Sequence, residues 1–207
     1  MIWSLLNLTA SIPYIIYTIG LCARLKTAAK ESHYKAVKRI FRYLVGTTYL
    51  GLWYKNGTHF NLVAYCDVDF PRNKMERKST SSACQFLGEA LNSWCYIKQK
   101  TIFTTNWCSH VLWIRNPLID FSLRYTNIQI FHDNINLINL SKNSKTHSRS
   151  KHREIKHHFI RDHVYKKEIK LVFIDTNNQL ADVFTKPLVE YRFIFINEKL
   201  KIIGNRI

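Results

Sequence analysis

The stretch that decides the fold is L-V-A-Y-C-D-V-D-F at residues 62–70, an apolar run that carries two aspartates. Its Val, Tyr and Phe residues favour extended backbone, so we expect a β-strand over residues 60–70. A carboxylate inside such a strand is costly to bury unless a cation or hydrogen-bond donors face it. Asp67 therefore marks a candidate site. Asp69, which the pleat turns to the same side, is a second-rank candidate.

Working outward from this strand, the sequence predicts a series of helices and further strands. Strands are expected over residues 50–54, 82–87, 91–97, 128–132 and 169–174, with a hairpin turn at Gly88. Helices are expected over residues 32–46, 135–140, 150–165, 178–186 and 191–203, whereas residues 104–118 are weakly helical at best. A helix, then antiparallel strands, then strand–helix units predict a mixed α/β domain with a partly parallel sheet.

Two further aspartates fall where such a sheet would hold a site. Asp133 follows the expected strand 128–132, and Asp182 lies early in the expected helix 178–186. Three converging carboxylates would suit Mg²⁺, which prefers oxygen ligands, and two such ions can promote phosphodiester cleavage. The alternative is three unrelated aspartates at strand ends and a helix cap, and the residues taken alone favour that alternative.

The charge balance points to a polyanionic partner. Lys and Arg number 31 against 14 Asp and Glu, a formal net charge of +17. Basic side chains release the counterions that condense on phosphate, so nucleic acid is the favoured partner. A basic protein without such a partner and a membrane-surface protein remain open as alternatives.

The cysteines and histidines bear on compartment and metal chemistry. The five cysteines include no C-x-x-C pair, which indicates a reduced intracellular protein, cytoplasmic or nuclear and not secreted, with no disulfide partner. Zinc is an alternative for five histidines. However, their five-residue steps are not a helical repeat, and no nearby Cys or carboxylate completes a tetrahedral set. These histidines are His147, His152, His157, His158 and His163.

The N-terminal residues 1–23 carry no charge, which is also typical of a segment that contacts a membrane. Asn7, Thr9, Ser11 and Pro13 interrupt the apolar run, and no basic segment precedes it. A membrane-associated fragment anchored by residues 1–23 is therefore kept as the less favoured alternative.

Several motifs, in order along nearly the whole chain, resemble the C-terminal part of copia-type LTR retrotransposon Pol polyproteins. Two stretches are similar to the end of the reverse transcriptase: S-L-L-N-L-T-A-S-I-P-Y (4–14) and K-E-S-H-Y-K-A-V-K-R-I-F-R-Y-L-V-G-T (30–47). Four resemble the ribonuclease H of that family: residues 62–70, E-R-K-S-T-S (76–81), I-F-H-D-N (130–134) and Q-L-A-D-V-F-T-K-P-L (179–188). Together these motifs are far more specific than any one of them.

The resemblance implies a ribonuclease H-like α/β fold: a mixed five-stranded sheet with flanking helices, preceded by a short helical reverse-transcriptase remnant. Residues 1–48 would be that remnant with a connection helix, 49–188 the ribonuclease H-like domain, and 189–207 a helical tail. The implied activity is cleavage of the RNA strand of RNA–DNA hybrids with two Mg²⁺ ions, or Mn²⁺. Asp67, Asp133 and Asp182 match the catalytic, metal-binding aspartates, and the rest of the Pol polyprotein is the implied ancestral partner.

Basic residues expected to bind nucleic acid lie on two predicted helices, between residues 140 and 150, and at position 78 before an expected strand. Such helices can follow the phosphates of a hybrid, which proteins recognise mostly by shape and backbone, although a solvated surface is the alternative. The candidates are Lys35, Arg39, Arg42, Lys78, Lys142, Arg149, Lys151, Arg153 and Lys156.

The chain also departs from the family. The S-T-x-E-A-E-Y block, whose Glu supplies a metal ligand, is missing from residues 101–113, and no Glu occurs from residue 90 to 153. Glu89, in the expected hairpin turn, reads as a surface residue and not as a substitute. We therefore expect a shortened helix after the meander and a weak or inactive nuclease. A non-catalytic, basic nucleic-acid-binding remnant is the alternative.

The N-terminal match predicts a fragment without polymerase activity. The family's R-P-D is replaced here by Ile12-Pro13-Tyr14, and the aspartate motif of the polymerase would lie upstream of Met1. Residues 1–45 would then expose an apolar face that has lost its partner, and poor solubility would follow.

Overall fold

The computed structural model describes residues 2–24, 30–54, 60–69, 79–99, 104–142 and 151–204. The chain begins with helical segments: α1 (Ile2–Leu8), the 3₁₀ turn η1 (Pro13–Ile15), α2 (Ile16–Arg24) and α3 (Glu31–Gly46). None of the helices in the described ranges combines the length and the apolar character that crossing a membrane requires.

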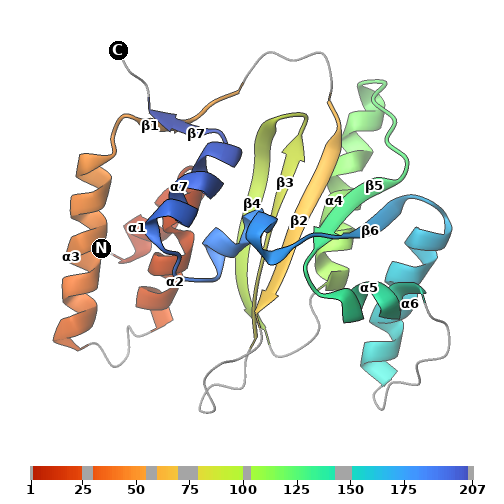
Figure 1. The fold of residues 1–207 in the computed structure, drawn as a ribbon, viewed down its shortest axis with the longest axis horizontal. Helices are drawn as coiled ribbons and strands as arrows, with labels where there is room; N and C mark the ends of the chain where they lie inside the picture. The colour runs from red at the N-terminus through yellow and green to blue at the C-terminus, as the bar shows by residue number, and fades with distance from the viewer. Residues whose placement is uncertain are drawn as a thin grey trace.

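A mixed sheet of five strands forms the centre of the molecule (Figure 1). β2 (Leu62–Asp69), β3 (Ser79–Leu87) and β4 (Ala90–Gln99) form an antiparallel meander, and Gly88 supplies the positive φ of 64° at its turn. β5 (Ile128–His132) and β6 (Ile169–Phe173) run parallel to β2, which gives the order β4-β3-β2-β5-β6. The expected α/β class with a five-stranded mixed sheet is confirmed.

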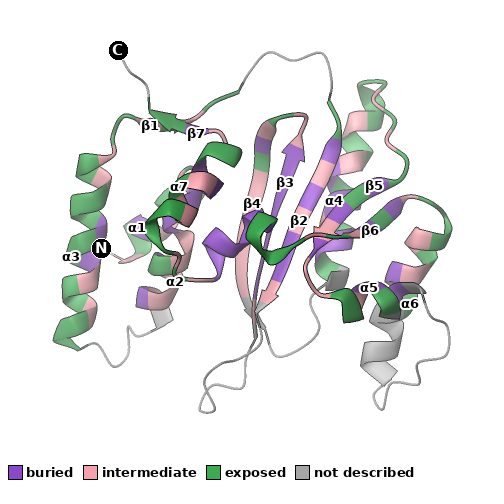
Figure 2. Ribbon diagram, in the orientation of Figure 1, coloured by how far each residue is buried: buried purple, intermediate pink, exposed green. Residues whose placement is uncertain are grey.

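The alternation of side chains along β2 divides the interior into two clusters. Leu62, Ala64 and Cys66 pack with the helices α4 (Thr104–Asp120), α5 (Ile135–Lys142) and α6 (Lys151–Tyr165). Val63 and Tyr65 point the other way, toward the N-terminal helices, the 3₁₀ turn η4 (Leu180–Phe184) and α7 (Glu190–Lys199). The central strands are accordingly buried along much of their length (Figure 2). Both faces of the sheet are covered.

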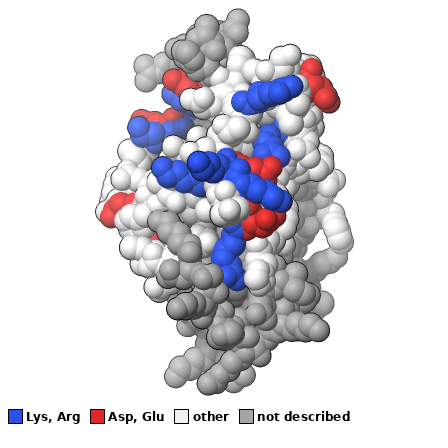
Figure 3. Space-filling view, turned by 90° about the vertical axis from the view of Figure 1, so that its right-hand side faces the viewer, with Lys and Arg blue, Asp and Glu red and all other residues white. Residues whose placement is uncertain are grey.

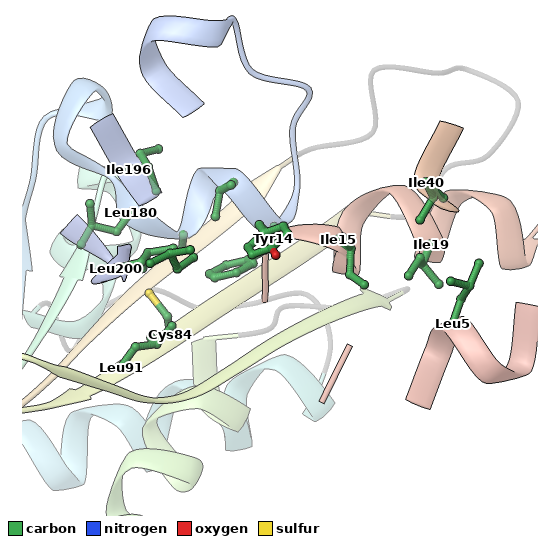
Figure 4. Packing of buried hydrophobic residues seen from close by; sticks show 14 of the residues in the cluster. Leu5, Tyr14, Ile15, Ile19, Ile40, Cys84, Leu91, Leu180, Ile196 and Leu200 are labelled. Carbon is green, nitrogen blue, oxygen red and sulfur yellow. The ribbon is translucent and has the colours of Figure 1, made fainter. Parts of the chain in front are cut away.

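The N-terminal helices belong to this second cluster. Leu5 is 1% exposed and Ile19 is fully buried, and both pack in one cluster with Leu200 near the other end of the chain (Figure 4). The Trp94 indole N–H on β4 also donates to the Thr9 carbonyl oxygen at 2.8 Å. The prediction that residues 1–45 expose an apolar face without a partner is therefore wrong, because the sheet, η4 and α7 cover that face.

A short two-stranded ribbon pairs the segment after α3 with the segment after α7. β1 (Leu50–Leu52) pairs antiparallel with β7 (Ile202–Gly204), and the Trp53 N–H donates to the Lys201 carbonyl oxygen at 2.8 Å. The expected strand over residues 50–54 thus lies outside the five-stranded sheet. The expected C-terminal helix ends at Lys199, because the residues after it turn to form this pair.

Two local expectations were wrong. Residues 104–118, expected to be weakly helical at best, lie in the 17-residue helix α4, because Trp107, Val111 and Ile114 form an i, i+4, i+7 stripe that is buried. The helix expected over residues 178–186 is replaced by the 3₁₀ turns η3 (Thr176–Asn178) and η4. All five residues of η4 are buried, and a carbonyl of this turn bonds to the sheet, as described below.

A candidate metal site at the ends of two parallel strands

The register of β2 and β5 brings two of the three predicted aspartates together. Cys66 pairs with His132 across these parallel strands, so the next residue on each chain segment is an aspartate, Asp67 or Asp133. Asp67 lies on the central strand and is 1% exposed, whereas Asp133 lies just beyond the strand end and is half-buried. The end of a parallel pair thus presents two adjacent carboxylates.

The third aspartate, Asp182, lies on η4, and two side-chain hydrogen bonds connect this turn and the residue before it to the sheet. The Gln179 Nε2 donates to the Cys66 carbonyl oxygen at 3.0 Å, and the Ser82 Oγ on β3 donates to the Ala181 carbonyl oxygen at 2.7 Å. Both bonds are buried, so their loss would leave polar groups without water. They fix Asp182, the residue after Ala181, against the end of β2.

The three carboxylates form a compact cluster. One oxygen from each of Asp67, Asp133 and Asp182 lies within 4.8 Å of the others, and no other group of three acidic, His or Cys ligands occurs among the described residues. Hard oxygen donors at this spacing fit Mg²⁺ or Mn²⁺. The structure therefore brings together all three aspartates that the sequence singled out.

The environment separates the pKa values of the three acids. Burial raises the pKa of Asp67 and of Asp182, and this effect outweighs the opposing influence of Lys186 on both. Burial would also raise the pKa of Asp133, but the interaction with the neighbouring His132 ring and the charge of Lys186 more than offset it and lower that pKa. Asp133, the least buried of the three, is thus the carboxylate that ionises most readily.

His132 holds the turn that carries Asp133. Its ring is fully buried, and its Nδ1 accepts the Asn134 backbone N–H at 3.0 Å and lies 3.4 Å from the Asp133 Oδ1. The Asn134 side chain in turn accepts the Asn136 N–H at 3.0 Å at the start of α5. This local network orients the acidic loop.

Sequence reasoning missed two neighbours of the aspartates on the segment after η4. Lys186 Nζ lies 2.8 Å from the Asp182 Oδ1 and 3.3 Å from the Asp67 Oδ1. The Thr185 hydroxyl donates to the Asp67 Oδ2 at 2.5 Å. The i, i+4 spacing of Asp182 and Lys186 was the available signal, since opposite charges at that spacing tend to pair.

A third missed residue, Arg192 on α7, joins the C-terminal helix to the site. Its guanidinium lies 3.1 Å from the Asp182 Oδ2 and donates to the Asn177 carbonyl oxygen at 2.7 Å and to the Thr176 carbonyl oxygen. One side chain therefore holds η3, η4 and α7 together behind Asp182.

Glu89, the other acidic residue considered from the sequence whose side chain is described, does not join the cluster. Glu89 is 66% exposed and lies 3.4 Å from the Lys201 ammonium, beside the β1–β7 ribbon, as its expected surface position requires. The side chain of Asp69 lies outside the described part of the structure. Within the described residues, the aspartate cluster has no fourth acidic member.

Of the predicted nucleic-acid-binding residues, three have described side chains. Lys35, Arg39 and Arg42 are exposed along α3, where Lys35 also pairs with Glu31 at 2.8 Å. The other six lie outside the described side chains: Lys78, Lys142, Arg149, Lys151, Arg153 and Lys156.

The opposite flank of the molecule mixes both signs of charge. Figure 3 shows basic side chains interspersed with acidic ones on the flank that carries α6. Two ion pairs there are Lys166–Asp162 at 2.7 Å and Arg115–Glu168 at 3.1 Å. Each of these pairs neutralises one basic side chain, as Glu31 neutralises Lys35 on α3.

The histidines and cysteines give no support to zinc or disulfide chemistry in the described residues. His163 bonds to Glu168, and His158 is exposed, while the side chains of His147, His152 and His157 lie outside the described part. All five cysteines are free thiols, and burial raises the pKa of the Cys95 thiol to about 11 and that of the Cys108 thiol to about 12. These thiols are protonated and unreactive at neutral pH.

Comparison with known proteins gives a consistent result at the level of sequence. No family model matches the chain. It is 34% identical over 201 residues to the retrovirus-related Pol polyprotein from transposon RE1 of Arabidopsis thaliana, and 30% identical over 211 residues to that from transposon RE2 of the same plant. These matches cover 92% and 97% of this chain but 14% of each relative, so the chain spans about one-seventh of their length.

Among solved structures, the foamy viral protease-reverse transcriptase dRH in complex with double-stranded DNA matches with a TM-score of 0.36. The match has 13% identity and covers 84% of this chain and 34% of that one.

Proposed function

Since the chain belongs, over more than nine-tenths of its length, with the retrovirus-related Pol polyproteins of copia-type transposons, we propose that it is a metal-dependent ribonuclease H-like domain of reduced activity. Its substrate would be the RNA strand of an RNA–DNA hybrid. The observation that carries the proposal is the cluster of three carboxylates within 4.8 Å at the end of β2 and β5.

The donor set fits the metal that this function requires. Asp67, Asp133 and Asp182 offer only carboxylate oxygens, which suit Mg²⁺ and Mn²⁺ better than softer ions. A bound divalent ion would supply positive charge for the attacked phosphate and would lower the pKa of a bound water. The remaining work belongs to the protein: Thr185, Arg192 and His132 hold the three carboxylates in place through the contacts described above.

Reduced activity follows from the incomplete ligand set. No described carboxylate joins the three aspartates, and the sequence of α4 contains no Glu. Members of a catalytic site act as a unit, so the absence of one ligand costs orders of magnitude in rate. We expect slow cleavage that is faster with Mn²⁺, which accepts irregular oxygen ligation more readily than Mg²⁺.

The test is a cleavage assay on a labelled RNA–DNA hybrid. Wild-type protein should cut the RNA strand in Mn²⁺, whereas Asp67→Asn should lose at least about a hundredfold in rate because one essential ligand is neutralised. Asp162→Asn removes an exposed carboxylate on α6 and serves as the matched control with wild-type rate. Cleavage that survives Asp67→Asn would show that a contaminating nuclease or another site is responsible, and the proposal would fail.

A second candidate function is binding of nucleic acid without cleavage. It is favoured by the exposed basic stripe of α3, together with the net charge of +17. The triple variant Lys35→Gln, Arg39→Gln, Arg42→Gln should then reduce the slope of log K against log salt by about 0.7–0.9 for each lost phosphate contact. Equal slopes for the variant and the wild type would show that α3 does not contact the nucleic acid.

A further inference from the structure

A cation of the protein itself occupies the aspartate cluster. The Lys186 ammonium contacts two of the three carboxylates, at 2.8 Å from Asp182 and 3.3 Å from Asp67. The side chains of these two aspartates are 3% and 2% exposed, so in the folded protein they have little access to solvent counterions. The two buried carboxylates have oxygens within 4.8 Å of each other, so they repel unless a positive charge lies between them.

Lys186 is the member of this group with the greatest access to solvent. The side chain of Lys186 is 18% exposed, which is more than either aspartate, and it reaches the site from the residue that follows Thr185 at the edge of η4. A lysine carries its charge on a flexible four-carbon stem with rotatable donors. The ammonium can therefore turn out toward water without any movement of the backbone that carries Asp182.

Arg192 has a different position. Its guanidinium contacts the other oxygen of Asp182, Oδ2, and is held by the carbonyl oxygens of Thr176 and Asn177. Arg192 therefore holds only Asp182, through the oxygen that Lys186 does not contact. Lys186 bonds to the Asp182 Oδ1 and the Asp67 Oδ1, so it would compete with a metal ion for both carboxylates.

We propose that Lys186 is a built-in counterion that occupies the divalent-metal position and must withdraw from the two carboxylates before a metal ion binds. The folded chain is then stable without metal and has a lower metal affinity than its three carboxylates alone would give. This inference rests on the metal site of the proposed function and adds to it a residue that sets metal affinity.

The first experiment measures binding of Mn²⁺ alone by titration calorimetry, without nucleic acid. Lys186→Met keeps the aliphatic stem and removes the charge, so it should bind Mn²⁺ roughly tenfold or more tightly than wild type. Lys186→Arg keeps a cation and should stay near the wild-type affinity. Lys166→Met, which also removes the lysine of an i, i+4 pair with an aspartate, is the matched control and should not change the affinity.

The outcomes separate this inference from the proposed function. Equal Mn²⁺ affinity for wild type and Lys186→Met would overturn the counterion role while leaving the metal site intact. Failure of every protein to bind Mn²⁺ would overturn the inference together with the metal-dependent function. In chelator, Lys186→Met should unfold at a lower temperature than wild type, and Mn²⁺ should raise its Tm by more than it raises that of wild type.

A second measurement uses the unmodified protein and does not depend on the folding of a variant. Acetylation of lysines by an amine reagent, followed by mass spectrometry, should label Lys186 several-fold faster in saturating Mn²⁺ than in chelator. The exposed Lys166 is the internal reference and should be labelled equally in both. Unchanged or slower labelling of Lys186 in Mn²⁺ would show that the ammonium stays in place, and the inference would be wrong.

Discussion

Replacement of Arg192 by Met tests whether the C-terminal helix holds the acidic turn. The substitution keeps an unbranched apolar stem but removes bonds from the guanidinium to the Thr176 and Asn177 carbonyl oxygens and to Asp182. The two carbonyl bonds are exposed and contribute about 0.5–1 kcal/mol each. The Asp182 side chain is 3% exposed and pairs with two cations, Arg192 and Lys186. Loss of Arg192 alone adds about 1–2 kcal/mol, because Lys186 still pairs with this carboxylate.

The sum predicts that the free energy of unfolding falls by about 2–4 kcal/mol. For a chain of this size each kcal/mol lowers Tm by roughly 2–4 °C, so the expected decrease is about 5–15 °C. Urea unfolding followed by circular dichroism at 25 °C would give the free energy, with Lys166→Met as a control that removes an exposed ion pair. If the Arg192 and Lys166 variants unfold at the same urea concentration as wild type, the bonds to η3 and η4 do not stabilise the site.

Three further predictions concern the core and the acids. Ile19→Ala should lower the free energy of unfolding by about 2–5 kcal/mol, because Ile19 is fully buried. The control Val45→Ala, at a position that is 75% exposed, should lower it by less than about 0.5 kcal/mol. Equal losses in urea unfolding would refute the packing of the N-terminal helices. Thr185→Val should lower the free energy of unfolding by about 1.5–3 kcal/mol in the same assay, because it removes a buried hydrogen-bond donor to the Asp67 carboxylate. An unchanged free energy of unfolding would contradict that hydrogen bond. Burial raises the pKa of Asp67 above the ordinary 3.8, so the folded chain binds the proton of this carboxyl group more tightly than the unfolded chain does. The folded chain therefore loses stability as pH rises from the pKa of the unfolded chain to the higher pKa of the folded chain. The Tm of Asp67→Asn minus that of wild type, in chelator, should therefore increase as pH rises above about 4, and a constant difference would contradict the raised pKa.

Two of the candidate aspartates could be found from sequence because each is anomalous in its own local pattern. Asp67 interrupts an apolar strand, and Asp133 ends another strand at a turn. Their convergence, however, depended on the parallel pairing of β2 with β5, which no local pattern specifies. It was expected through the family resemblance and not through the residues alone.

The parts that the sequence did not predict depend on contacts between distant residues. β1 and β7 pair although they lie far apart in sequence, and Arg192 reaches η3 from α7, so neither contact has a local signature. The helix α4 was underestimated because Pro117 lies inside it and polar residues are mixed with the apolar ones along its sequence. Burial against the sheet outweighs its weak intrinsic preference, as tertiary packing often does.

The cluster that joins Leu5 to Leu200 has a consequence for how the chain reaches its native state. Contacts between residues so far apart in sequence give a high contact order, and such topologies fold slowly because loop closure must precede the energetic gain. During synthesis, the strand β4 and the turn η4, which the N-terminal helical segments contact, are made well after those segments. The apolar side chains of the N-terminal helices would therefore remain available to chaperones, or to aggregation, until those later elements have been made.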